Sequence, residues 1–90
     1  MKHENVTLLC KEGLHLRVAS QVAKIAQKAG GTVKIRSKKE RSSANACSVL
    51  ELLTLGATSG TSLEIVAEGP NEETVITALS EILRQEDTAL

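Results

Sequence analysis

Hydrophobic and polar residues alternate in several short stretches of the chain, and these stretches predict β-strands. Residues 32–36 alternate at every position, and the stretch 32–37 is typical of a strand with one buried face. Residues 6–11 and 63–68 show a similar but less strict pattern. Residues 42–46 return from the polar turn 38–41 and are a weaker candidate, because serine, asparagine and alanine have low strand propensity. The pattern therefore predicts four strands.

The apolar residues of other stretches recur with helical spacing. From Val18 they recur four, seven, eight and eleven positions later, which is the stripe of an amphipathic helix, and the glycine pair at 30–31 ends it. Ser48 and Glu51 have the spacing of a capping box, in which the serine hydroxyl accepts from the Glu51 amide and the carboxylate reaches back to the serine amide. A short helix to about Leu55 is therefore expected.

A last helix follows the turn at residues 69–71, with Asn71 as its expected cap and two glutamates in its first turn. The predicted order of elements is thus β-α-β-β-α-β-α. The short β-β connection favours antiparallel pairing, and three apolar helix stripes need a sheet face to cover. We predict one α+β domain over residues 1–90, an open-faced β-sandwich with a four-stranded antiparallel sheet and three helices on one face. Residues 86–90 are expected to form a frayed tail.

Composition and charge narrow the classes of function. The 11 Lys and Arg balance the 11 Asp and Glu, so no net charge attracts nucleic acid or an acidic membrane. The chain has no Phe, Trp or Tyr, which removes the stacking platforms of single-strand binders. No apolar run is long enough for a signal peptide or a membrane span. Cys10 and Cys47 define no disulfide framework, so we expect a cytoplasmic protein with reduced thiols.

The candidate chemistry lies at His15, between the turn at Gly13 and the start of the first helix. A neutral imidazole is nucleophilic near neutral pH, because its ordinary pKa is about 6.5. The amino end of a helix favours a negative group, and Arg17 could donate charge-assisted hydrogen bonds to it. A polar turn residue without chemistry is the plain alternative for His15. A metal site formed by His3, Cys10 and His15 lacks any recognised ligand spacing.

Two motifs together carry a resemblance to a known family. The stretch GLHLR at residues 13–17, the stretch SANACSVLELLTLGA at residues 43–57 and the order of elements resemble the HPr phosphocarriers of the sugar phosphotransferase system. The chain departs from the family pattern at Val18, where the family usually has proline, and at Leu16, where it usually has a small residue. Valine keeps the apolar contact but loses the fixed φ that suits proline to a first helical turn.

The resemblance implies a histidine phosphocarrier rather than a stand-alone catalyst. His15 would accept a phosphoryl group from Enzyme I through Nδ1, Arg17 would stabilise it, and Enzyme IIA-type domains would receive it. The alternative is a regulatory HPr-like module of the nitrogen-related or carbon-regulation branch, not coupled to sugar transport. No cofactor and no metal are implied, and a monomer is expected.

The resemblance also implies regulation and docking. Ser48 would be phosphorylated by an HPr serine kinase/phosphorylase, although the neighbouring Glu51 carboxylate opposes a phosphate there. A small apolar patch with a basic rim would bind the acidic surfaces of the partner proteins. The implied docking residues are Leu16, Ser20, Lys24, Val49, Leu50 and Leu53.

Overall fold

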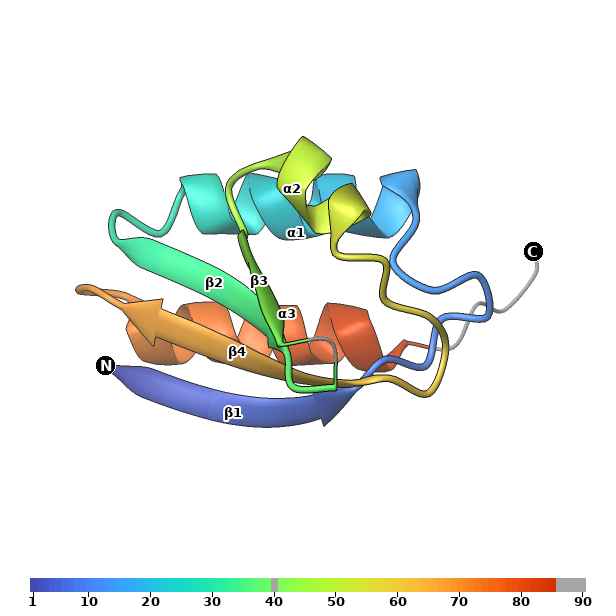
Figure 1. The fold of residues 1–90 in the computed structure, drawn as a ribbon. Coiled ribbons are helices and arrows are strands. Elements are labelled where there is room, and N and C mark those ends of the chain that lie inside the picture. The colour runs from blue at the N-terminus through green and yellow to red at the C-terminus, as the bar shows by residue number, and fades with distance from the viewer. Residues whose placement is uncertain (40, 86–90) are drawn as a thin grey trace.

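The computed structural model describes residues 1–39 and 41–85, and its elements follow the predicted order (Figure 1). The predicted tail at residues 86–90 lies outside the described residues. The strands are β1 (Lys2–Thr7), β2 (Thr32–Ser37), β3 (Ser42–Asn45) and β4 (Ser62–Glu68), and the helices are α1 (Leu16–Gln27), α2 (Val49–Thr54) and α3 (Glu72–Arg84).

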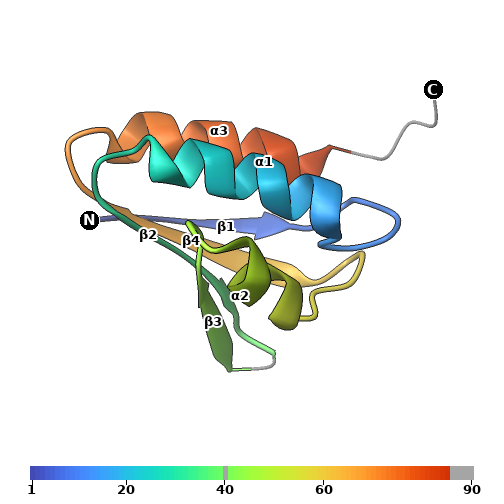
Figure 2. The ribbon, with the colours of Figure 1, turned by 90° about the horizontal axis from the view of Figure 1, so that it is seen from above.

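The four strands form one antiparallel sheet in the order β1-β4-β2-β3. Helices α1 and α3 lie side by side over the same face of this sheet, and α2 packs against α1 and β3 (Figure 2). The alternation in β2 explains the layering, because Val33 and Ile35 are buried under the helices whereas Lys34 and Arg36 are exposed on the other face. The predicted open-faced α+β architecture is confirmed.

The first strand differs in its bounds from the predicted range 6–11. Burial still alternates beyond Thr7, since Leu8 is fully buried and Leu9 is exposed. However, the Leu8 amide donates to the carbonyl of Thr61 (2.9 Å) and the Leu9 amide donates to the carbonyl of Leu83 (3.0 Å). The Leu8 bond still joins the residue before β4, whereas the Leu9 bond turns the chain toward the end of α3, and the strand ends at Thr7.

Both predicted cap residues precede a helix, but only the Ser48 side chain caps its helix as predicted. The Ser48 hydroxyl accepts from the Glu51 amide at 3.2 Å, as expected. The Glu51 carboxylate accepts from the Asn45 amide (3.0 Å) instead of the Ser48 amide, which donates to the Asn45 carbonyl. The Asn71 side chain does not cap α3 but donates to the carbonyl of Ala29 (3.3 Å), and so links the ends of two helices.

The core is aliphatic, as a chain without aromatic residues requires. Cys10 is buried and Cys47 is half-buried, and no disulfide joins them. Among the described residues, no helix has the length and apolarity to cross a lipid bilayer. The largest fully buried side chains come from the sheet, from all three helices and from the residue after β1, and include Leu8, Val22, Val33, Ile35, Leu52, Leu63, Ile65, Leu79 and Leu83.

Candidate functional site

A tight turn sets the position of His15. The Gly13 amide donates to the carbonyl of Cys10 (2.9 Å), and Gly13 has a φ of 74°, in the left-handed region. A Cβ atom at residue 13 would lie 2.5 Å from the carbonyl oxygen of Ala57. Next, the Leu14 amide donates to that same carbonyl (3.0 Å), and the Leu14 side chain is buried. The turn is therefore fixed against residue 57, directly before His15.

His15 is the residue from which α1 begins. Its backbone is extended (φ −91°, ψ 177°), and its carbonyl accepts from the Ala19 amide at 2.9 Å, the first hydrogen bond of the helix. The amides of Leu16, Arg17 and Val18 precede that bond, and the His15 side chain does not cap them. The first turn carries no acidic residue. This helix start therefore combines donor groups and a positive dipole end with a histidine, an arrangement that suits a bound negative group.

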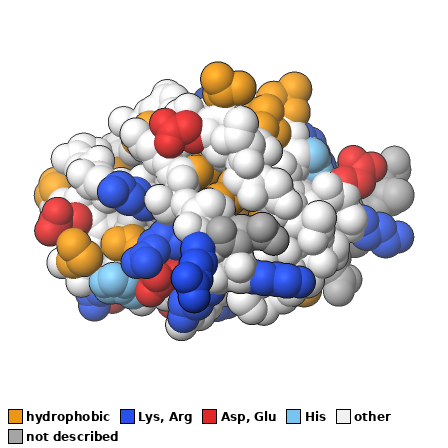
Figure 3. All heavy atoms as spheres, in the orientation of Figure 1, with side chains coloured by type: hydrophobic (Ala, Val, Ile, Leu, Met, Phe, Trp, Pro, Cys, Tyr) orange, Lys and Arg blue, Asp and Glu red, His pale blue; other side chains and the backbone are white. Residues whose placement is uncertain are grey.

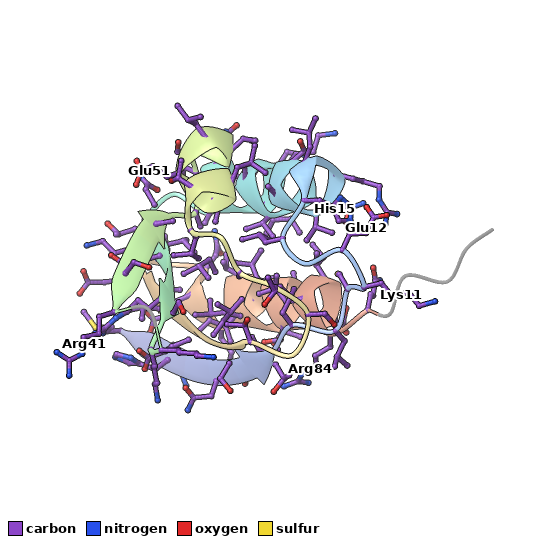
Figure 4. All side chains as sticks on the ribbon, turned by 45° about the vertical axis from the view of Figure 1, so that its right-hand side comes forward. Lys11, Glu12, His15, Arg41, Glu51 and Arg84 are labelled. Carbon is purple, nitrogen blue, oxygen red and sulfur yellow. The ribbon has the colours of Figure 1, made fainter. Side chains whose placement is uncertain are left out.

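The His15 ring lies partly inside the molecule. The side chain as a whole is half-buried, and its Nε2 atom is shielded from solvent. Arg17, two residues further along the chain, is exposed. Figure 4 shows His15 at the start of α1, at the end of the helix that borders the turn containing Glu12. The shielding of Nε2 disfavours an attack from solvent through that nitrogen.

Three leucines of α1 and α2 are exposed. Leu16 is 62% exposed, Leu50 is 72% exposed and Leu53 is 37% exposed. The spacing of apolar residues in α2 predicts a buried stripe of Val49, Leu52 and Leu53, with Leu50 outside it. Leu50 is exposed as predicted, but the burial predicted for Leu53 is wrong, because only Leu52 of α2 enters the core. Figure 3 shows hydrophobic side chains protruding along the upper edge of the molecule, where α1 and α2 lie. An exposed cluster of leucines on adjoining helices is typical of a docking surface.

A hollow of about 320 Å³ lies between α1 and α2. It brings together three of the expected docking residues, Ser20, Lys24 and Val49. Gln27 also lines it, and the Gln27 side-chain amide donates to the carbonyl of Cys47 at 2.9 Å. The sequence motifs do not single out Gln27, although its position seven residues after Ser20 and three after Lys24 places it on the same helix face.

The remaining candidate residues have structural partners. Ser48 is half-buried and its hydroxyl caps α2, as described above. The His3 ring bonds to the carboxylate of Glu64 (Nδ1 to Oε2, 3.1 Å), away from α1 on the open face of the sheet. Within residues 1–39 and 41–85, no group of three or more His, Cys, Asp or Glu side chains is arranged to hold a metal ion.

Comparison with known proteins agrees with this geometry. The family model described as "PTS HPr component phosphorylation site" matches residues 2–85. The phosphocarrier protein HPr of Haloferax volcanii is 35% identical over 78 residues, which cover 87% of this chain and 88% of the relative. The HPr of Vibrio cholerae is 33% identical over 85 residues, 94% of this chain and 98% of the relative. The crystal structure of HPr-C-His from Thermoanaerobacter tengcongensis superposes with a TM-score of 0.84, at 29% identity, over 92% of this chain and 91% of that one.

Proposed function

We propose that this chain, which belongs to the HPr family of the phosphotransferase system, carries phosphoryl groups on His15 from Enzyme I to Enzyme IIA-type domains. The observation that carries the proposal is the position of His15 immediately before α1, where three amides precede the first helical hydrogen bond. No cofactor is needed for this exchange. We infer further that the carrier works as a monomer in the cytoplasm.

The transfer step uses the lone pair of His15 Nδ1. In the neutral tautomer with its proton on the shielded Nε2, Nδ1 attacks the phosphorus atom of the phosphorylated donor. The Nδ1–P bond forms while the bond to the donor breaks, and the donor leaves with the electron pair of that bond. The amides of Leu16 and Arg17, together with the helix dipole, stabilise the negative charge of the transferred phosphoryl group. The Arg17 guanidinium adds charge-assisted hydrogen bonds to the phosphoryl oxygens.

Partner proteins dock on the face that surrounds His15. The exposed side chains of Leu16, Leu50 and Leu53 supply a small apolar area. The hollow that contains Ser20, Lys24 and Val49 continues it and adds a positive charge. A carrier has to bind and release several partners in turn, and a small patch with a charged rim suits such transient contacts.

Ser48 is the second phosphorylation site that we propose, through an HPr serine kinase/phosphorylase. It lies at the amino end of α2, where the helix dipole favours a phosphate. The Glu51 carboxylate is bonded to the Asn45 amide rather than to the Ser48 amide. A phosphate on Ser48 would compete with the capping bond from the Glu51 amide, so the modification would loosen α2 next to the docking face.

The test is to incubate the chain with phosphoenolpyruvate and Enzyme I, and then to measure its intact mass before and after acid treatment. We expect the mass of one added phosphoryl group, lost in acid because a phosphohistidine N–P bond is labile. His15→Ala should remove the addition, whereas His3→Ala, the matched control in the other histidine of the chain, should keep it. Labelling of His15→Ala equal to that of the unaltered chain would contradict the proposal.

The alternative function is a regulatory HPr-like module that does not serve sugar transport. It is favoured by Val18 and Leu16, the two departures from the usual family pattern within the helix start. The two functions are separated by adding an Enzyme IIA domain to the phosphorylated chain, because a carrier passes its phosphoryl group to that domain. A chain that is phosphorylated on His15 but keeps the group in the presence of several IIA domains would be the regulatory module.

A further inference from the structure

The open face of the sheet carries a concentration of positive charge that phosphoryl transfer at His15 does not use. Residues 34–41 hold five of the eleven Lys and Arg of the chain but only one of its eleven Asp and Glu. The net charge of the whole chain is zero, so the charge of this hairpin is balanced by acidic residues elsewhere. Figure 3 looks onto this face and shows Lys and Arg side chains gathered over the strands.

A hollow of about 410 Å³ lies on this face, within the size range of sites for small ligands. It is away from α1, because its lining comes from the strands and from the first residue of the chain. Lys34 and Arg36 line it from β2, and Val66 lines it from β4, paired in register with Lys34. Thr32, Ser43 and Glu68 add two hydroxyl groups and a carboxylate.

The Lys and Arg side chains of the hollow differ in their ion pairs. One Arg36 guanidinium nitrogen lies 3.5 Å from the carboxylate of Glu64, which also bonds to His3. Glu64 is only 15% exposed, so it holds the Arg36 head in place, while 56% of the Arg36 side chain stays exposed to solvent. Lys34 makes no ion pair with any described residue. The hollow therefore offers one positioned guanidinium and one ammonium group to a ligand.

The residues that line the hollow are suited to a ligand that combines a phosphate, hydroxyl groups and a carbon skeleton. Arg36 and Lys34 together suit a phosphate, which accepts charge-assisted bonds from both. The hydroxyls of Thr32 and Ser43 and the carboxylate of Glu68 suit ligand hydroxyl groups, because these both donate and accept hydrogen bonds. Val66 offers an apolar surface to the carbon skeleton. Nucleobases are disfavoured, because the chain has no Phe, Trp or Tyr on which a base could stack and the His3 ring at this hollow is bonded to Glu64.

We propose that the open face of the sheet binds a small phosphorylated, hydroxyl-rich molecule, of the chemical class of the sugar phosphates, in the hollow lined by Lys34 and Arg36. The surrounding charges of the β2–β3 hairpin draw the anion toward this face. The site is independent of the phosphoryl group on His15, since α1 lies on the other face of the sheet. The carrier can therefore hold such a molecule while its docking face exchanges partners.

The test is a titration of the unphosphorylated, isotope-labelled chain with glucose 6-phosphate, followed through the backbone amide signals in nuclear magnetic resonance spectra. We expect saturable shifts in β2, β3 and β4. The double variant Lys34→Gln with Arg36→Gln should bind at least tenfold more weakly, whereas Lys28→Gln, which removes an exposed positive charge at the end of α1, should bind as the unaltered chain does. Inorganic phosphate and glucose should each bind more weakly than glucose 6-phosphate.

Four results would overturn the proposal. These are shifts that do not saturate, shifts confined to the start of α1, an unchanged affinity in the double variant, and equal affinity for inorganic phosphate and glucose 6-phosphate. Failure of this site would leave the proposed carrier function intact. Conversely, the double variant should still accept a phosphoryl group on His15, so the two ideas are tested separately.

Discussion

Gly13 shows how much one residue determines at this site. Its φ of 74° is costly for a residue with a side chain, and the space where a Cβ would lie is filled by the carbonyl of Ala57. The same carbonyl accepts the Leu14 amide, so it cannot move without loss of that bond. The requirement for glycine is therefore both conformational and steric, and both parts act directly before His15.

We expect Gly13→Ala to lower the free energy of unfolding by more than about 2 kcal/mol, since the left-handed backbone alone costs about 1–2 kcal/mol. Gly60→Ala is the matched control, because Gly60 has a φ of 90° but nothing lies within 4 Å of its added Cβ. Denaturant unfolding followed by far-ultraviolet circular dichroism measures both, as the chain has no Trp or Tyr for fluorescence. Equal losses in the two variants would show that the contact with residue 57 is unimportant. Gly13→Ala should also slow phosphorylation of His15, because the turn that positions the ring is displaced.

At the scale of single elements, α2 depends on its cap. This helix has only six residues, and Leu52 is its one buried side chain, so little burial stabilises it. The Ser48 hydroxyl accepts the Glu51 amide at the start of the helix. The same helix presents Leu50 and Leu53 on the docking face. Loss of the cap should therefore affect both stability and partner binding.

We expect Ser48→Ala to lower the free energy of unfolding by about 1 kcal/mol, the usual cost of a lost helix cap. Ser59→Ala, in the exposed loop before β4, is the control and should change it by less than about 0.5 kcal/mol. Hydrogen exchange at the amides of α2 should rise in the Ser48 variant, while exchange in β2 and β4 stays the same. A variant as stable as the control, with unchanged exchange in α2, would contradict the importance of this cap.

The elements also show what could be predicted from the sequence. The bounds predicted for the strand at residues 32–37 are those observed. Every second side chain of this strand is buried, so the alternation of burial can be predicted from the residues of the strand alone. The polar residues at the start of β1 pair with β4, some sixty positions away, so the start of this strand could not be predicted from its own residues. The placement of His15 before α1 was local and could be predicted. The exposure of Leu53 and the bond from Gln27 to Cys47 depend on how α1 packs against α2. That packing cannot be predicted from the sequence pattern of either helix alone.

At the scale of the whole molecule, ion pairs join β1 to α3 and so hold the first strand against the rest of the fold. The Met1 amino group lies 3.2 Å from the Glu72 carboxylate, and Glu4 accepts hydrogen bonds from Ser80 and Arg84. Since β1 lies at the edge of the sheet and pairs only with β4, these contacts supplement a single ladder of hydrogen bonds. They also give the stability of the fold a dependence on pH.

The pKa of Glu72 is lowered from its ordinary value, chiefly because its carboxylate accepts a hydrogen bond from the Gly69 amide (3.2 Å) and also because the Met1 amino group lies next to it. A pKa that is lower in the folded chain than in the unfolded chain means that ionised Glu72 stabilises the fold at neutral pH. That contribution is lost as the pH falls from about 4.5, the ordinary pKa, through the lower pKa of the folded state.

We therefore expect Glu72→Gln to melt at a lower temperature than the unaltered chain at pH 7, and the difference to shrink as the pH falls through this window. Glu73→Gln removes the neighbouring charge in the same first turn of α3 and is the matched control, with a smaller effect at pH 7. Thermal melts by circular dichroism at a series of pH values measure both variants. A melting difference for Glu72→Gln that stays constant from neutral to acid pH would mean that its ionised carboxylate does not hold β1 against α3.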